Sequence, residues 1–192
     1  PSMKSTDPVS GLQHWGHTDL VNMAALEWYA KACEMFAASN AQEVRAEWKD
    51  YRAAIVKILD RWRGNSKGKD ELFLPITATG EREGELVNQG FFYLHPAGFA
   101  ESGLLTADEL LRLRKNLLRQ GYANEKGLYM RHPSPVPEFN RHVWYTTWCE
   151  KQWMHAWMRV GKFDLAKQAL EATLRYSVSD EFIVGEGYHD AQ

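Results

Sequence analysis

Two stretches of this chain predict helices that are apolar around most of their circumference, and this feature constrains the fold more than any other. From about residue 19 to 38 the polar side chains Glu27, Lys31 and Glu34 form one narrow stripe, and most of the remaining residues are apolar or small. The stretch 143–160 repeats the pattern and carries five tryptophan or tyrosine side chains. A helix of this kind has to be buried on most sides. Both stretches therefore predict the inner helices of a layered all-α fold.

Each apolar stretch is followed by a helix with one apolar face. In the segment 41–62, apolar residues recur from Val44 to Trp62 at helical spacing, and a second helix is expected over 163–176. Asp19 is expected to cap the first inner helix, because its carboxylate can accept orphan N–H groups of the first turn. For the helix over 163–176, we expect one buried face made of Leu165, Ala166, Ala169, Leu170, Thr173 and Leu174.

A third, weaker couplet lies between these two. Thr106-Ala107-Asp108-Glu109 forms a capping box that opens a helix over 106–120. Its inner partner is expected over 86–94, where Pro96 cuts it short.

The three couplets begin near residues 19, 86 and 143, a spacing of roughly 60 residues without any sequence repeat. Alternating inner and outer helices predict two layers, arranged as a flat α-solenoid or as a closed or partly closed toroid. The long connections 1–18, 63–85, 121–142 and 177–192 all precede inner helices or end the chain. They are therefore expected at one end of the helical array, where function usually lies.

Length, charge and cysteine content exclude several classes of protein. The 192 residues suit one domain over 1–192, or a piece of a larger one. A net charge of −2 without a basic cluster argues against nucleic acid as a partner, and no apolar run is long enough to cross a membrane. The two cysteines, Cys33 and Cys149, exclude a disulfide scaffold. The first residues lack the apolar core of a secretory signal. The compartment is therefore left open: the cytoplasm, or the periplasm or exterior after processing.

The stretch Trp144 to Ala166, an aromatic helix ending in Arg-x-Gly and followed by an Ala/Leu-rich helix, resembles hairpins of the six-hairpin glycosidases. The tail from Glu181 to Asp190 is similar to a loop that leads into a further inner helix of that family, and His17-Thr18-Asp19-Leu20 is similar to a hairpin start. The resemblance implies an (α/α)6 barrel. Six hairpins of roughly 60 residues need about 360–400 residues, so the chain holds about three of the six. We therefore expect a fragment or half-barrel that associates with itself or with the missing half.

The resemblance also implies a carbohydrate substrate and an acid/base carboxylate mechanism. Glycoside hydrolysis needs one protonated and one ionised carboxyl group. Glu186 lies between two glycines, which leaves its side chain unshielded; Glu85 precedes an expected helix, and Asp190 follows in the tail. These three are the expected catalytic residues.

Aromatic rings stack on the apolar faces of sugar rings, and histidines can hydrogen-bond to sugar hydroxyls. The expected substrate-binding residues are those near the loop-bearing end: Trp15, His17, His142, Trp144, Tyr145, Trp148, Tyr188 and His189. Trp153 and Trp157, deeper in their helix, are expected in the core. No spacing typical of metal ligands occurs, so neither a metal nor a cofactor is expected.

Two other functions fit the same pattern. A sugar epimerase or polysaccharide lyase on the same toroid would use histidine or tyrosine as a proton shuttle, for which His142, Tyr145, Tyr188 and His189 are available. A non-enzymatic helical-repeat scaffold would instead bind a partner in its concave face.

Overall fold

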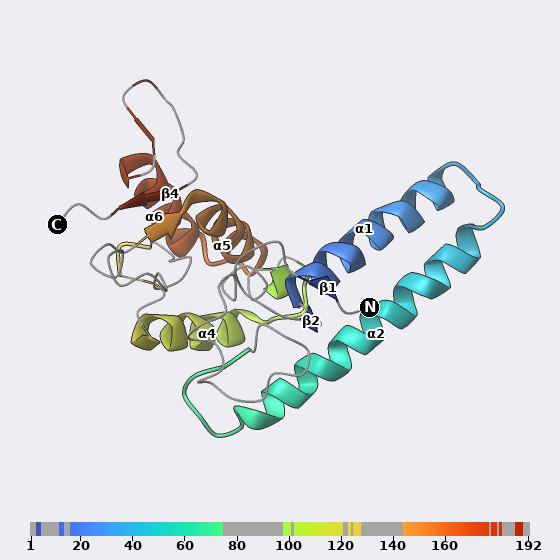
Figure 1. Cartoon of the computed structure of the whole chain (residues 1–192), viewed down its shortest axis with the longest axis horizontal. Coiled ribbons are helices and arrows are strands. Elements are labelled where there is room, and N and C mark those ends of the chain that lie inside the picture. The colour runs from blue at the N-terminus through green and yellow to red at the C-terminus, as the bar shows by residue number, and fades with distance from the viewer. Residues whose placement is uncertain are drawn as a thin grey trace.

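The computed structural model describes residues 3–4, 12–13, 16–74, 98–100, 102–120, 123, 125–127, 144–176, 178–179, 181 and 187–189. For 3–4, 12–13, 16–18, 120, 144–150 and 187–189 it describes the backbone alone. The described residues are predominantly helical (Figure 1), which confirms the all-α prediction. The long helices are α1 (Gly16–Met35), α2 (Ala41–Asn65), α4 (Ala107–Gln120), α5 (Thr147–Arg159) and α6 (Phe163–Tyr176).

Two short strand pairs accompany the helices. Strand β1 (Met3–Lys4) pairs antiparallel with β2 (Leu12–Gln13), and β3 (Trp144–Thr146) pairs antiparallel with β4 (Gly187–His189). The inner helix expected over 86–94 lies outside the described residues, and 98–100 are helical just before the segment that leads into α4.

The described helices form two antiparallel hairpins with the same type of turn. At the end of α5, the N–H of Lys162 donates to the carbonyl of Trp157 at 2.8 Å, and Gly161 has φ 74°. This pair of features is a Schellman motif, in which glycine enters the left-handed region at no steric cost. The turn after α1 has the same bonds, Ala38 N–H to the Cys33 carbonyl at 2.9 Å, but Ala37 occupies the left-handed position with φ 51°.

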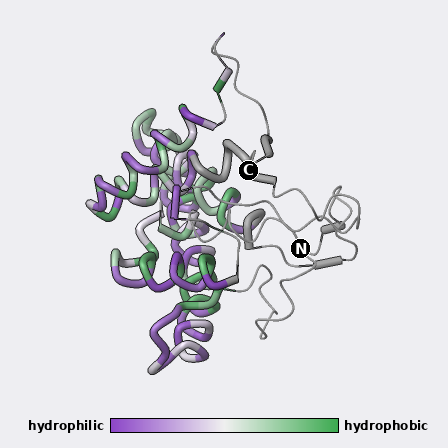
Figure 2. The backbone as a smooth tube through the Cα atoms, turned by 90° about the vertical axis from the view of Figure 1, so that its left-hand side faces the viewer, coloured by the Kyte–Doolittle hydropathy of each residue, from purple (hydrophilic) through white to green (hydrophobic). Residues whose placement is uncertain are grey.

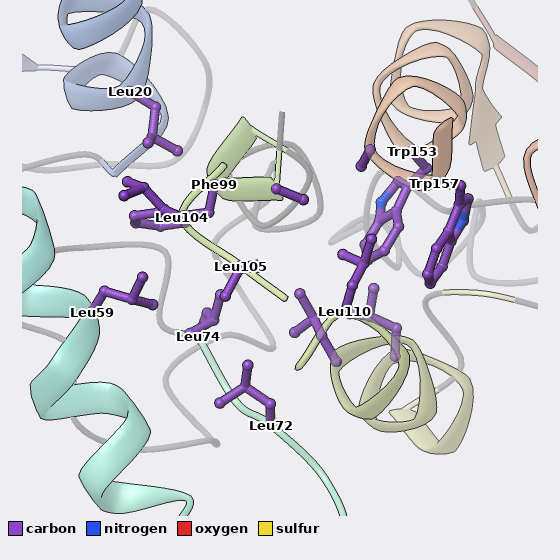
Figure 3. Packing of buried hydrophobic residues seen from close by; sticks show 14 of the residues in the cluster. Leu20, Leu59, Leu72, Leu74, Phe99, Leu104, Leu105, Leu110, Trp153 and Trp157 are labelled. Carbon is purple, nitrogen blue, oxygen red and sulfur yellow. The ribbon is translucent and has the colours of Figure 1, made fainter. Parts of the chain in front are cut away.

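The main core lies where α2, α4, α5 and the first turns of α1 meet. In Figure 3, Leu20, Leu59, Leu110, Trp153 and Trp157 point from four helices into one interior. Trp153 and Trp157 are both buried, with ring centroids 5.5 Å apart, so the prediction that they belong to the core is confirmed. A second aromatic pair packs edge to face: the ring centroids of Trp62 in α2 and Phe99 in the helical segment 98–100 lie 5.9 Å apart.

The segment after α2 is held along α4 by polar contacts. The Asn116 amide donates to Glu71 at 3.0 Å, and Arg119 donates to the same carboxylate at 2.8 Å. The side chains of Leu72 and Leu74 are buried in the main core. The segment therefore closes the core between α2 and α4.

Sequence reasoning placed two helix starts wrongly. Helix α1 begins at Gly16, so Asp19 lies in its first turn and is not its N-cap. Its carboxylate accepts a hydrogen bond from the Tyr51 hydroxyl at 3.0 Å, which ties α1 to α2. Residues 144–146, expected in the helix 143–160, form β3, and α5 begins only at Thr147. Pairing with β4 gives these three residues an extended backbone that the local apolar pattern could not reveal.

The expected burial of α1 and α6 was also wrong in part. Helix α1 is buried on one side only, and four of its large apolar side chains are exposed, as is Phe36 directly after it. Helix α6 buries Ala166, Ala169 and Ala172, whereas Leu170 and Leu174 are exposed. Small side chains let α6 pack close to α5, so its larger residues point outward. Figure 2 shows the resulting mixture of hydrophobic and hydrophilic residues along the described helices.

Candidate functional site

The strands β3 and β4 bring together four of the residues that the sequence marked for sugar binding. The backbone register sets Trp144 opposite His189 and Tyr145 opposite Tyr188. The third pair joins Thr146 to Gly187, the residue directly after Glu186. Residues more than forty positions apart in the sequence therefore share one short ladder, although only the backbone is described here.

The ladder lies at the N-terminal end of α5, since β3 runs directly into this helix. Trp148, another expected sugar contact, is the second residue of α5. In Figure 1, β4 lies beside α5 and α6, while the α1–α2 hairpin extends away on the opposite side of the molecule. The described part of the connection 177–192 thus meets the beginning of α5.

The other expected site residues are not part of the described β3–β4 ladder. His17 is the second residue of α1. The expected catalytic residues Glu186, Glu85 and Asp190, and the expected sugar contacts Trp15 and His142, lie outside the described residues.

Three described carboxylates have pKa values clearly shifted from their ordinary range, and all three are lowered. Burial alone would raise the pKa of Glu109, but hydrogen bonds from Arg63 and Thr106 outweigh it and hold the pKa below its ordinary value. Burial alone would also raise the pKa of Glu71, but hydrogen bonds from Arg119 and Asn116 outweigh it and lower this pKa. At Glu34 the main cause is the hydrogen bond from Arg45. A general acid needs a raised pKa, so none of these three carboxylates suits that role; the arginine contacts that lower their pKa values join separate segments of the fold.

Glu109 lies at one edge of a hollow of about 390 Å3 between α2 and α4. Arg63 donates to both its oxygens, at 2.6 and 3.0 Å, and Arg112 donates to the carbonyls of Ser66 and Lys69 at 3.2 and 2.8 Å. The two guanidinium groups of this hollow are thus engaged in holding α2, α4 and the segment between them.

A second hollow, of about 440 Å3, follows one face of α2. Its cations, Lys49, Arg52 and Lys57, form no ion pair within the described part of the chain, and the buried indole N–H of Trp48 has no acceptor there. These groups can donate hydrogen bonds to an anionic or hydroxyl-rich ligand. The sequence analysis did not predict this hollow. The three cations at positions 49, 52 and 57 of an amphipathic helix could have indicated a positively charged surface there.

Within the described part of the chain, no three histidine, cysteine, aspartate or glutamate side chains converge as metal ligands would. No described helix combines the length and the apolar character that crossing a bilayer requires. Cys33 is a buried free thiol in the α1–α2 hairpin.

No family model, no curated protein and no solved structure matches this chain.

Proposed function

We propose that this chain is a glycosidase-like domain that binds an oligosaccharide beside the β3–β4 ladder. The observation that carries the proposal is the backbone register, in which Trp144 and Tyr145 face His189 and Tyr188. Carbohydrate sites combine aromatic rings with a few hydrogen-bonding groups, and each of the two cross-strand pairs supplies both, on its own face of the ladder. Support also comes from the two described helical hairpins, α1–α2 and α5–α6, which would be two of the three hairpins that a half of an (α/α) toroid contains.

In this proposal the reaction uses two carboxylates. Glu186 directly precedes Gly187, which pairs with Thr146 in the ladder, and it acts as one of the two catalytic carboxyl groups. Glu85 is the second, and Asp190 is the alternative to it. One of the pair protonates the glycosidic oxygen while the other acts as base or nucleophile. The aromatic residues hold the sugar rings so that the scissile bond lies between the carboxylates.

Binding is tested by thermal shift with a panel of neutral and acidic oligosaccharides. A ligand present at 100 times its Kd stabilises the folded state by about 2.7 kcal/mol, which is a shift of roughly 5–10 °C for a chain of this size. The shift should disappear in Trp144→Ala and Tyr188→Ala. It should persist in Phe163→Ala, which removes an exposed ring at the start of α6. A panel without any shift contradicts the proposal and favours the non-enzymatic scaffold.

Catalysis is tested with chromophoric glycosides of the sugar that binds. General acid–base catalysis contributes typically about 100- to 10,000-fold, so Glu186→Gln should lower kcat by at least about 100-fold with little change in binding. The matched control is Glu181→Gln, because Glu181 is exposed, lies five positions upstream and contacts only Ser179 among the described residues. Equal turnover in the two variants would remove Glu186 from the mechanism. Unsaturated products would assign a lyase reaction instead.

A further inference from the structure

One side of helix α1, together with Phe36 directly after its last residue, is an exposed apolar surface, which we call the α1 face. Its large members are Val21, Trp28, Tyr29, Met35 and Phe36, with exposed fractions of 52, 69, 54, 76 and 79%. Ala24 and Ala25 are exposed beside them. Scattered exposed apolar residues are ordinary on a protein surface, but a contiguous patch of this size marks an interaction site.

The α1 face has the spacing of a coiled-coil seam. Val21, Ala25, Trp28, Ala32 and Met35 follow one another at intervals of four, three, four and three residues. This is the heptad spacing by which one helix keeps a continuous apolar seam toward another. Large and small residues alternate along it. A second helix can therefore place large side chains over the alanines and approach closely.

The charge of the α1 face favours an apolar partner. Lys31, the nearest cation, forms an ion pair with Glu27 at 2.7 Å, and its ammonium lies 4.7 Å from the centre of the Trp28 ring. No other charged residue lies among the members of the face. An identical face would thus meet it without like-charge repulsion, and no acidic or basic partner is called for.

The hairpin that carries this face has little core of its own. Its outer half is held by a small cluster of Ala30, Cys33 and Val44, packed with Leu26 and two further alanines. Figure 1 shows the α1–α2 hairpin extending away from the other helices, with α1 along its upper edge in this view. One side of α1 therefore contacts α2, and no described residue buries the large side chains on the opposite side.

The exposed area is large enough for a symmetric dimer. An aromatic side chain buries about 150–250 Å2 when it is covered, so the three exposed rings together with Val21 and Met35 offer roughly 600 Å2 per chain. Two copies would bury roughly 1,200 Å2, which reaches the lower end of the range for specific interfaces.

We propose that the α1 face binds the same face of a second copy, with the two α1 helices antiparallel. In this arrangement Trp28 of each chain lies over Ala25 of the other, and Val21 lies over Ala32. A twofold axis makes both contacts occur twice. Antiparallel pairing also sets each helix N-terminus beside the C-terminus of the other, which the helix dipoles favour. The dimer is independent of the proposed sugar site.

The test is sedimentation equilibrium of the full chain over micromolar concentrations. The wild type should dimerise reversibly. Trp28→Glu should raise the dimer dissociation constant by roughly 100-fold or more, because it removes the central ring and inserts a charge twice per interface. The matched control is Leu174→Glu, which puts the same charge on an exposed leucine of α6 and should leave the constant unchanged.

A second variant separates specific packing from general adhesion. Ala25→Leu adds apolar surface to the α1 face, so a merely adhesive face would associate more strongly. In the proposed seam the larger side chain fills the space of the opposing Trp28 and should weaken the dimer roughly tenfold.

Four results would overturn the proposal. The first is a wild-type chain that stays monomeric throughout. The second is equal weakening by Leu174→Glu, and the third is tighter association of Ala25→Leu. The fourth is a loss of helicity in dilute Trp28→Glu, because it would assign Trp28 to the chain's own core.

Discussion

The contact between Arg63 and Glu109 joins the end of α2 to the beginning of α4, and Glu109→Gln tests its contribution to stability. The Glu109 side chain is only 14% exposed. It accepts two hydrogen bonds from Arg63, at 2.6 and 3.0 Å, and one from the Thr106 N–H at 2.9 Å. This last bond completes the predicted capping box, which is confirmed. The carboxylate therefore satisfies a helix start and a guanidinium at the same time.

The size of the effect follows from these contacts. A hydrogen bond to a charged group contributes about 1.5–3 kcal/mol. Glutamine keeps the shape and one acceptor, and Arg63 retains Asp60 at 2.9 Å and the Leu104 carbonyl at 2.8 Å. We therefore expect Glu109→Gln to lower the free energy of unfolding by about 2 kcal/mol. For a chain of this length that is roughly 4–8 °C in Tm.

Asp108→Asn is the matched control for this change. Asp108 lies in the same first turn of α4, is exposed, and forms no hydrogen bond or ion pair among the described residues. Its removal costs only an interaction with the helix dipole, about 0.3–1 kcal/mol. Urea unfolding of the wild type and both variants at neutral pH measures the difference. Equal losses in the two variants would refute the account, because both would then reflect helix charge alone.

The pH dependence provides a second check. The folded chain holds the pKa of Glu109 below its unfolded value of 4.5. The carboxylate therefore contributes its full stability above that value, and the contribution is lost as the pH falls through the lower, folded pKa. The difference in the free energy of unfolding between the wild type and Glu109→Gln should become smaller as the solution is acidified below about pH 4.5. A difference that stays constant in acid would mean that the charge of Glu109 does not matter.

Two further predictions concern the core and the hairpin turns. Trp62→Ala should lower the free energy of unfolding by about 3–5 kcal/mol, because the ring is buried against Phe99; a loss below 1 kcal/mol in urea unfolding would show a poorly packed core. The two Schellman turns should respond in opposite directions. Gly161→Ala should destabilise the chain by about 1 kcal/mol and Ala37→Gly should stabilise it slightly, since both positions have positive φ. Thermal unfolding measures both, and equal signs would contradict the argument.

Much of the fold could be predicted from local sequence patterns. The 3.6-residue spacing from Val44 to Trp62 predicted α2, and the Thr106–Glu109 pair predicted the start of α4, because both signals arise within one helix. Glycine at position 161 marked the α5–α6 turn for the same reason. The all-α class followed from these local features, and so did the core positions of Trp153 and Trp157.

The tertiary structure decided which faces are covered and which distant residues meet. An apolar pattern states that a helix can be buried on several sides, but burial needs neighbours, and among the described elements α2 and the main core contact only one side of α1. The register of β3 and β4 joins Tyr145 to Tyr188 across more than forty residues, and no local period encodes such a pairing. Helix periodicity is a property of the chain itself. Contacts between distant segments depend on how complete elements pack, so the β3–β4 ladder and the open face of α1 became visible only in three dimensions.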